Sequence, residues 1–94
     1  MINYELLPGV VLLSVAKEHL LVADKEARKK VGYILQINDA GAYYWKLMEQ
    51  GLDLREIVRR GSCHFGMDSK QTIVVLDNFM KKLNKAGYLK VERV

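Results

Sequence analysis

The first third of the chain contains short runs rich in Val, Ile and Leu, separated by turn and polar residues, which is typical of β-strands. The pattern predicts strands over residues 10–13, 19–23 and 31–37, with a turn at Lys17 and Glu18 between the first two. In the third run, one face carries Val31, Tyr33, Leu35 and Ile37, and the other carries Gly32, Ile34 and Gln36. The three runs together predict a small antiparallel meander.

Residues 24–30 join the second and third predicted strands. Most of them are charged, which favours a loop. Residues 25–29 are helix formers, so a single turn of helix is the alternative.

After residue 37 the apolar residues recur with the period of a helix. The first helix is expected over about residues 39–50, because Asn38 or Asp39 can accept hydrogen bonds from the first-turn amides and Gly51 can end it in the left-handed conformation. The second opens with Asp53, has Glu56 three residues later as in a capping box, and is expected to end near Gly61.

The third helix is the longest expected element. It opens at Asp68, with Gln71 three residues later, and ends at Gly87. Val74 lies outside its apolar arc and is either an exposed contact or an incidental surface valine. The arc itself consists of Thr72, Ile73, Val75, Leu76, Phe79, Met80, Leu83 and Ala86. These elements predict a single α+β domain over residues 1–94, with a three-stranded antiparallel sheet followed by three helices.

The aromatic residues of the first helix have two interpretations. Tyr43, Tyr44 and Trp45 could stack on nucleic-acid bases, but Tyr44 and Trp45 share the inward side of the helix with Gly41 and Met48. We therefore expect Tyr44 and Trp45 to belong to the core.

Composition and charge narrow the function classes. With 94 residues, half of them apolar, the chain suffices for one domain. Its single cysteine, Cys63, cannot form an internal disulfide, and the apolar run 10–13 is too short for a signal sequence or a membrane span, so we expect a cytoplasmic protein. The net charge of +4 suits nucleic acid, an acidic peptide or an anionic protein surface, although the basic residues are scattered.

Residues that could carry chemistry do not form a credible pattern. Cys63 and His64 are adjacent and point in different directions, and His19 is the other histidine. The carboxylates Glu49, Asp53 and Glu56 fall at helix ends, where capping and the helix dipole explain them. We therefore predict no enzymatic activity, no metal and no cofactor.

A series of short motifs follows the order and spacing of a known family. The motifs are Ile37-Asn38, Gly41-Ala42, Tyr44-Trp45, Leu47-Met48, Gly51 and Glu56-Ile57-Val58, and they close with Leu76, Phe79, Leu83 and Gly87-Tyr88-Leu89. By this series the chain resembles, over residues 9–89, the PqqD-like proteins, which are named for pyrroloquinoline quinone biosynthesis protein D and are also called peptide-recognition elements of ribosomal peptide maturation. The resemblance implies a winged-helix-like fold.

The resemblance also implies a function. In PqqD-like proteins the leader of a ribosomally made precursor peptide adds as a strand to the third strand of the meander, in a groove completed by the third helix. The module has no chemistry of its own and presents the precursor to a modifying enzyme, often a radical S-adenosylmethionine protein. A strand edge that accepts a leader can also accept a second copy, so a homodimer is compatible with this function.

The peptide-binding residues implied here lie on the third strand and the third helix. The strand edge would be formed by Val31, Gly32, Tyr33, Ile34, Leu35 and Gln36. Candidates on the helix are Val75, Phe79 and Lys82 on one flank, and Ile73 and Met80 on the other, and either flank could face the groove. Ordinary core packing is the alternative for Phe79 and Ile73.

The chain departs from the family pattern in two places. Residues 24–30 are more basic than the short turn common in the family, and residues 59–65 replace an Ala/Glu-rich helical run. The second departure places the end of the second helix in doubt.

A DNA-binding winged helix is the alternative function. The basic pI and the polar residues Lys70, Gln71, Asn78 and Lys81 on the third helix support it. Asp77 in the middle of that face opposes it, and residues 88–94 are expected to be too short for the usual two-stranded wing. Nucleic acid is therefore the less favoured partner.

Overall fold

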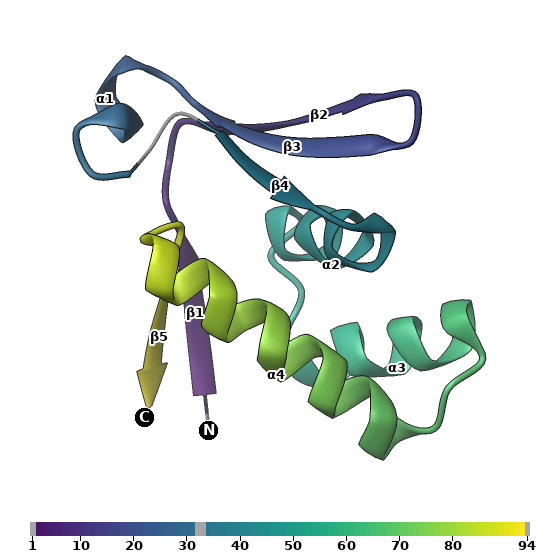
Figure 1. The fold of residues 1–94 in the computed structure, drawn as a ribbon. Coiled ribbons are helices and arrows are strands. Elements are labelled where there is room, and N and C mark those ends of the chain that lie inside the picture. The colour runs from purple at the N-terminus through teal and green to yellow at the C-terminus, as the bar shows by residue number, and fades with distance from the viewer. Residues whose placement is uncertain (1, 32–33, 94) are drawn as a thin grey trace.

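The computed structural model describes residues 2–31 and 34–93, which form an α+β fold. Three strands make one antiparallel sheet, and helices pack below it (Figure 1). The elements in chain order are β1 Ile2–Leu6, β2 Val10–Val15, β3 Glu18–Ala23, α1 Lys25–Arg28, β4 Ile34–Ile37, α2 Asp39–Glu49, α3 Leu54–Phe65, α4 Ser69–Ala86 and β5 Leu89–Arg93. The predicted fold class, a three-stranded antiparallel sheet followed by three helices, is confirmed.

The meander has the strand order β2-β3-β4, with Leu12 opposite Leu21 and Leu21 opposite Leu35. The β2–β3 hairpin is longer than predicted, since β2 extends to Val15, which lies opposite Glu18. The last strand is shorter: it begins at Ile34, and Val31 lies in a bend before it. The predicted strand residues Gly32 and Tyr33 lie outside the described residues.

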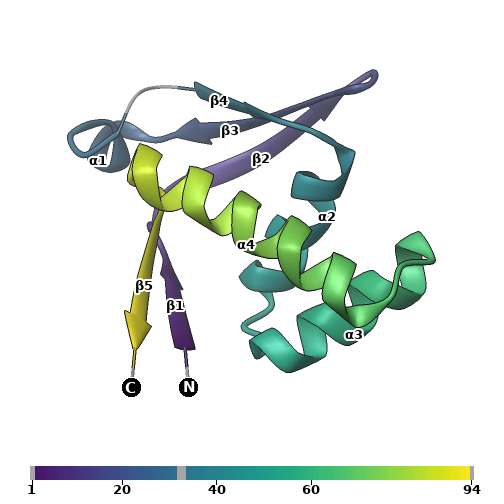
Figure 2. The same ribbon diagram turned by 60° about the horizontal axis from the view of Figure 1, so that its bottom comes forward.

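A second sheet was not predicted. β1 pairs antiparallel with β5, with Tyr4 opposite Val91, so the two ends of the chain lie side by side (Figures 1 and 2). The residues after α4 are too short to form a two-stranded unit of their own, as expected, and the pairing with β1 was not foreseen. The C-terminal residues supply one strand, and the N-terminal residues supply the other.

The connection between β3 and β4 contains α1, so the predicted loop was wrong and the alternative, a turn of helix, is confirmed. The Asp24 carboxylate accepts a hydrogen bond from the Ala27 amide at 2.9 Å and caps the turn. Ala27 is buried, which gives this short helix an apolar anchor.

The predicted caps of the three long helices are confirmed. Asn38, Asp53 and Asp68 each accept a hydrogen bond from the backbone amide three residues later, at 2.7, 2.8 and 2.8 Å. Of the two candidates at the start of α2, Asn38 is the cap and Asp39 is the first helical residue.

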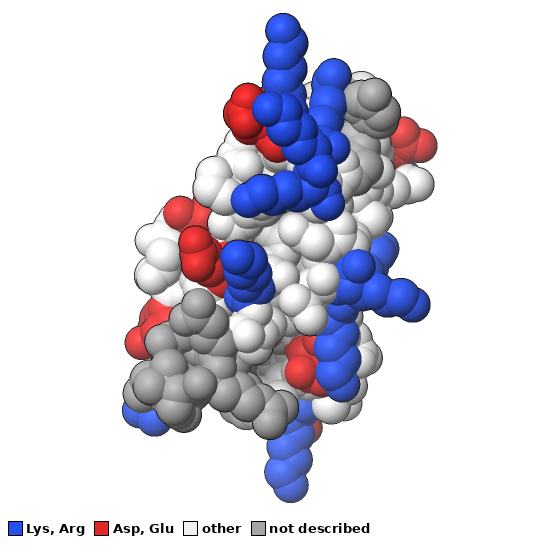
Figure 3. All heavy atoms as spheres, turned by 90° about the vertical axis from the view of Figure 1, so that its left-hand side faces the viewer, with Lys and Arg blue, Asp and Glu red and all other residues white. Residues whose placement is uncertain are grey.

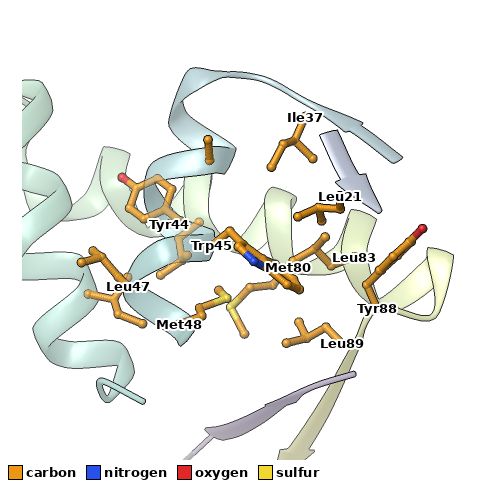
Figure 4. Close-up of a cluster of buried hydrophobic side chains, with 13 residues drawn as sticks. Leu21, Ile37, Tyr44, Trp45, Leu47, Met48, Met80, Leu83, Tyr88 and Leu89 are labelled. Carbon is orange, nitrogen blue, oxygen red and sulfur yellow. The ribbon is translucent and has the colours of Figure 1, made fainter. Parts of the chain in front are cut away.

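The core lies between the meander and the helices. Tyr44 and Trp45 are fully buried, as expected, and Figure 4 shows the Trp45 ring at the centre of the apolar cluster. Leu21 joins the cluster from the sheet and Leu83 from α4. Truncating a buried aromatic side chain costs about 3–5 kcal/mol, so this ring is a major contributor to the stability of so small a domain.

The second predicted helix does not end at Gly61. Helix α3 continues to Phe65 and ends at Gly66, whose φ of 65° is left-handed. Gly61 is present for a different reason, because a Cβ at this position would lie 2.5 Å from the hydroxyl oxygen of buried Tyr44 and 2.6 Å from its ring. The absence of a side chain at Gly61 lets α3 pack directly against Tyr44.

This contact predicts that Gly61→Ala destabilises the fold. Alanine normally stabilises a helix relative to glycine by about 1 kcal/mol, but here its methyl group must displace the Tyr44 ring, and overpacking costs about 1–3 kcal/mol. We expect a lower midpoint of chemical unfolding for Gly61→Ala. Cys63→Ala, at an exposed position of the same helix, is the matched control and should change the midpoint little. A Gly61→Ala midpoint equal to or above wild type would show that the packing of α3 on Tyr44 is not tight.

Candidate functional site

The outer edge of β4 has no strand partner among the described residues. Its hydrogen-bonding direction follows from the register. The Asp24 amide donates to the Gly9 carbonyl at 2.8 Å, and along an antiparallel strand the direction of the backbone groups alternates. By this alternation, the backbone groups of Leu20 and Val22 form hydrogen bonds with β2. Those of His19 and Leu21 form hydrogen bonds with β4.

The same alternation continues on β4. Leu35 lies opposite Leu21 and Ile37 opposite His19, so the backbone groups of Leu35 and Ile37 face β3. The amides and carbonyls of Ile34 and Gln36 therefore face the open edge. Ile34 is also one of the more exposed large apolar side chains of the described structure.

Helix α4 runs beside this open edge, in the direction opposite to β4. The Lys82 ammonium donates to the Gln36 carbonyl at 3.2 Å, which independently confirms that this carbonyl points outward. Phe79 lies at the far end of β4, where its ring is 2.9 Å from the position of a Cβ on Gly41. Val31 lies at the near end, 2.8 Å from the position of a Cβ on Gly87, which caps α4.

The structure separates the two predicted flanks of α4. Lys82 and Phe79 lie toward β4, and Val75, one heptad before Lys82, shares their side of the helix. Ile73 and Met80 lie on the other flank, where they line a groove together with residues of α3 and Val91 of β5. The core-packing alternative is wrong for Ile73, which is 52% exposed, whereas Phe79 is half-buried and packs against the core.

The second flank of α4 belongs to a groove of about 950 Å³ that the sequence analysis did not identify. Its walls are α3 and α4, and Val91 of β5 lies at one side. The lining residues are Leu54, Arg55, Val58, Arg59, Ser62, Ser69, Ile73, Leu76, Asp77, Met80, Lys81, Asn84 and Val91. The sequence analysis predicted neither β5 nor the full length of α3. It therefore could not indicate that residues of α3, α4 and β5 line one groove.

Charge is distributed unevenly around these two regions. Lys and Arg side chains gather at the top of Figure 3, where α1 lies next to the start of β4. At the rim of the groove, Glu56 bonds to Arg59 at 2.8 Å and to Arg60 at 3.0 Å. These hydrogen bonds, first from Arg59 and then from Arg60, lower the pKa of Glu56 to about 2.

Ser14, His19 and Asp39 form a chain of hydrogen bonds that the sequence did not reveal. Ser14 Oγ lies 2.7 Å from His19 Nδ1, and His19 Nε2 lies 2.6 Å from Asp39 Oδ1. The order resembles a catalytic triad, but a triad also needs oxyanion donors and a substrate pocket. The Asp39 side chain is 86% exposed, and none of the three residues lines the groove. Their evident effect is to join the β2–β3 hairpin to the start of α2.

Within residues 2–31 and 34–93, no three His, Cys, Asp or Glu side chains are grouped so that they could hold a metal ion. No helix in this part of the chain is long and apolar enough to cross a bilayer.

Comparisons with known proteins bear on the fold. No protein-family model and no curated protein matches the chain. Among solved structures, the chain is similar to TbiB1 in complex with the TbiA(beta) leader peptide, with a TM-score of 0.74, 21% sequence identity, and coverage of 92% of this chain and 94% of that one. The two chains share a fold. The likeness extends over nearly the whole length of both, so it includes the sheet and α4.

The low pKa of Glu56 predicts a pH-dependent contribution to stability. The folded-state pKa lies below the ordinary 4.5, so the contribution is present above pH 4.5 and is lost as the pH falls toward 2. We expect Glu56→Gln to reduce the loss of stability across this window, measured by urea unfolding at a series of pH values. Glu49→Gln is the control, because Glu49 has no ion pair among the described residues. An acid dependence in Glu56→Gln as steep as in wild type would contradict the assignment.

Proposed function

We propose that the chain is a non-catalytic peptide-binding module that takes up the leader of a ribosomally made precursor peptide and presents it to a modifying enzyme. The peptide adds as a strand to the outer edge of β4 and lies between that edge and α4. The observation that carries this proposal is the open edge itself, where the backbone groups of Ile34 and Gln36 point toward the flank of α4 that holds Phe79 and Lys82. The shared fold of TbiB1, whose structure holds a leader peptide, and the PqqD-like motifs both support it.

The energy of binding must come from backbone and side chains together. Ile34 and Gln36 offer two amides and two carbonyls, and at about 0.5–1.5 kcal/mol for each hydrogen bond they contribute about 2–6 kcal/mol. Association costs at least about 4 kcal/mol, while micromolar affinity needs about −8 kcal/mol. Leader side chains must therefore be buried as well, and Val31, Val75 and Phe79 are the apolar residues placed to receive them.

Lys82 has a specific part in this proposal. In the free protein its ammonium satisfies the Gln36 carbonyl, one of the groups to which an added strand would donate. An incoming leader amide replaces Lys82 at this carbonyl, and the released ammonium can pair with a carboxylate of the leader. The cations near α1 favour an acidic leader in the same way.

The partner in this proposal is the modifying enzyme that the family resemblance implies, such as a radical S-adenosylmethionine protein. The module works in the cytoplasm without a cofactor of its own. Because the β4 edge can also pair with the β4 edge of a second copy, homodimerisation would compete with leader binding.

DNA binding is not favoured. The α4 face that would contact DNA carries Lys81, but its ammonium is engaged by Asp77 at 3.0 Å. The solved structure that shares the fold is a complex with a peptide.

A proline series tests strand addition. Proline lacks the amide donor and is tolerated where the amide of an edge strand faces outward. Ile34→Pro and Gln36→Pro should therefore stay folded by circular dichroism but bind the leader at least about tenfold more weakly, because each variant loses one amide donor and the close fit of the added strand. Leu35→Pro should unfold, because it removes an amide that bonds to β3. The probes are candidate leader peptides encoded beside the gene, titrated by fluorescence anisotropy.

Ile34→Ala and Gln36→Ala are the controls, since they keep the amides and change only the side chains. If folded Ile34→Pro and Gln36→Pro both bind the leader as tightly as their alanine controls, the peptide does not add to β4. Sedimentation of each variant without peptide reports whether the same edge forms a dimer.

A further inference from the structure

We infer that the groove between α3 and α4 is a second binding site, which takes an amphipathic helix with acidic flanks from a protein partner. The groove lies on the flank of α4 opposite to the one that faces β4, so both sites can be occupied at once. The inference depends on the groove's own residues and holds whether or not a peptide adds to β4.

The floor of the groove is apolar. Leu76 and Met80 form its base and are 4% and 7% exposed, and Val58 packs beside them from α3. Ile73 stands at the wall with half of its surface in solvent. An exposed isoleucine next to a recessed apolar floor is typical of a surface that a partner covers.

The geometry of the walls favours a helix as the occupant. Ile73, Leu76 and Met80 follow one another at three and four residues along α4, and Leu54 and Val58 at four residues along α3. Apolar rows of this kind on the two walls of a groove can receive the apolar stripe of a third helix, the helix-in-groove mode of recognition. The wall from Ile73 to Asn84 is about 16 Å long at 1.5 Å per residue, so a helix of about three turns would fill it.

The charge at the rim of the groove indicates which charged residues a partner helix should carry. Arg55 and Arg59 line the α3 side, and Arg60 lies next to them. Glu56 is shared between Arg59 and Arg60, and Arg55 has no ion pair within the described residues. On the α4 side, Lys81 and Asp77 neutralise each other. The excess of guanidinium groups along α3 therefore complements carboxylates on the flank of an incoming helix.

Other occupants fit less well. A second copy of this chain carries the same basic surface and a net charge of +4, so the two copies would repel each other at this rim. A flat membrane cannot reach the recessed side chains of Leu76 and Met80.

The test uses two designed helical peptides of about 14 residues. Both have leucine along one stripe, one has glutamate on its flanks, and the other has lysine at the same positions. Binding is measured by fluorescence anisotropy at low and high salt, and the contact surface by amide shifts in nuclear magnetic resonance spectra. We expect the acidic peptide to bind in a salt-sensitive manner and to shift the amides of Val58, Ile73 and Val91.

Two neighbouring residues of α4 give a matched pair of variants. Ile73 is 52% exposed and lines the groove, whereas Val74 is 59% exposed and does not. Ile73→Asp should weaken binding of the acidic peptide by about tenfold or more, because the burial of an isoleucine is lost and a carboxylate that repels the peptide is added. Val74→Asp should bind as wild type does, and Arg55→Glu should remove the preference for the acidic peptide. Circular dichroism checks that each variant is folded.

Ile34→Pro separates this site from the proposed leader site, since it should bind the acidic helix as wild type does. The inference fails if the lysine peptide binds equally well, if Ile73→Asp and Val74→Asp behave alike, or if neither peptide binds at about 1 mM. It also fails if the protein alone forms a dimer that Ile73→Asp abolishes, because the groove would then hold a second copy.

Discussion

The burial of Tyr44 and Trp45 is the constraint on which the rest of the structure depends. These two side chains leave α2 in different directions: Trp45 fills the space between the meander and α4, and Tyr44 packs on Gly61 of α3. One turn of helix thus joins the sheet to both of the long helices. Because α4 is fixed by Leu76, Met80 and Leu83 in the same core, its two flanks are presented at defined positions.

The position of α4 accounts for the separation of the two binding surfaces that we propose. One flank runs along β4 with Lys82 at the Gln36 carbonyl, and the opposite flank forms a wall of the groove with α3. The first surface offers backbone groups that no strand of the described residues pairs with, which suit an extended peptide of varied sequence. The second offers an apolar floor and a basic rim, which suit an amphipathic helix. A module of this kind can hold a peptide on one side while a protein partner docks on the other.

Features that depend on local sequence could be predicted, and those that depend on distant residues could not. Asn38, Asp53 and Asp68 were identifiable as caps because a cap acts on the amide three residues away. The β1–β5 sheet was missed because it pairs Tyr4 with Val91, at opposite ends of the chain. Gly61 was interpreted as a helix stop because its closeness to Tyr44 exists only in the folded structure.

In the candidate site, too, features that depend on local sequence could be predicted and those that depend on distant residues could not. The edge strand and the two sets of α4 residues were identifiable from alternation and helical phase, but their assignment to β4 or to the groove needed the register. Ile73 fitted the apolar arc of α4 and is nevertheless exposed, because it lies on the wall of the groove between α3 and α4 and not in the core. The chain Ser14–His19–Asp39 joins a hairpin to a helix, and its residues had no common spacing in the sequence.

Hydrogen exchange of the β4 amides tests the central claim most directly. In the free protein, the amides of Leu35 and Ile37 should exchange slowly because they bond to β3, and those of Ile34 and Gln36 should exchange rapidly because they face the open edge. Addition of a leader peptide should slow the exchange of the Ile34 and Gln36 amides. The exchange rates of the Leu35 and Ile37 amides should stay nearly unchanged. Rapid exchange at Ile34 and Gln36 with the leader bound would contradict strand addition at β4.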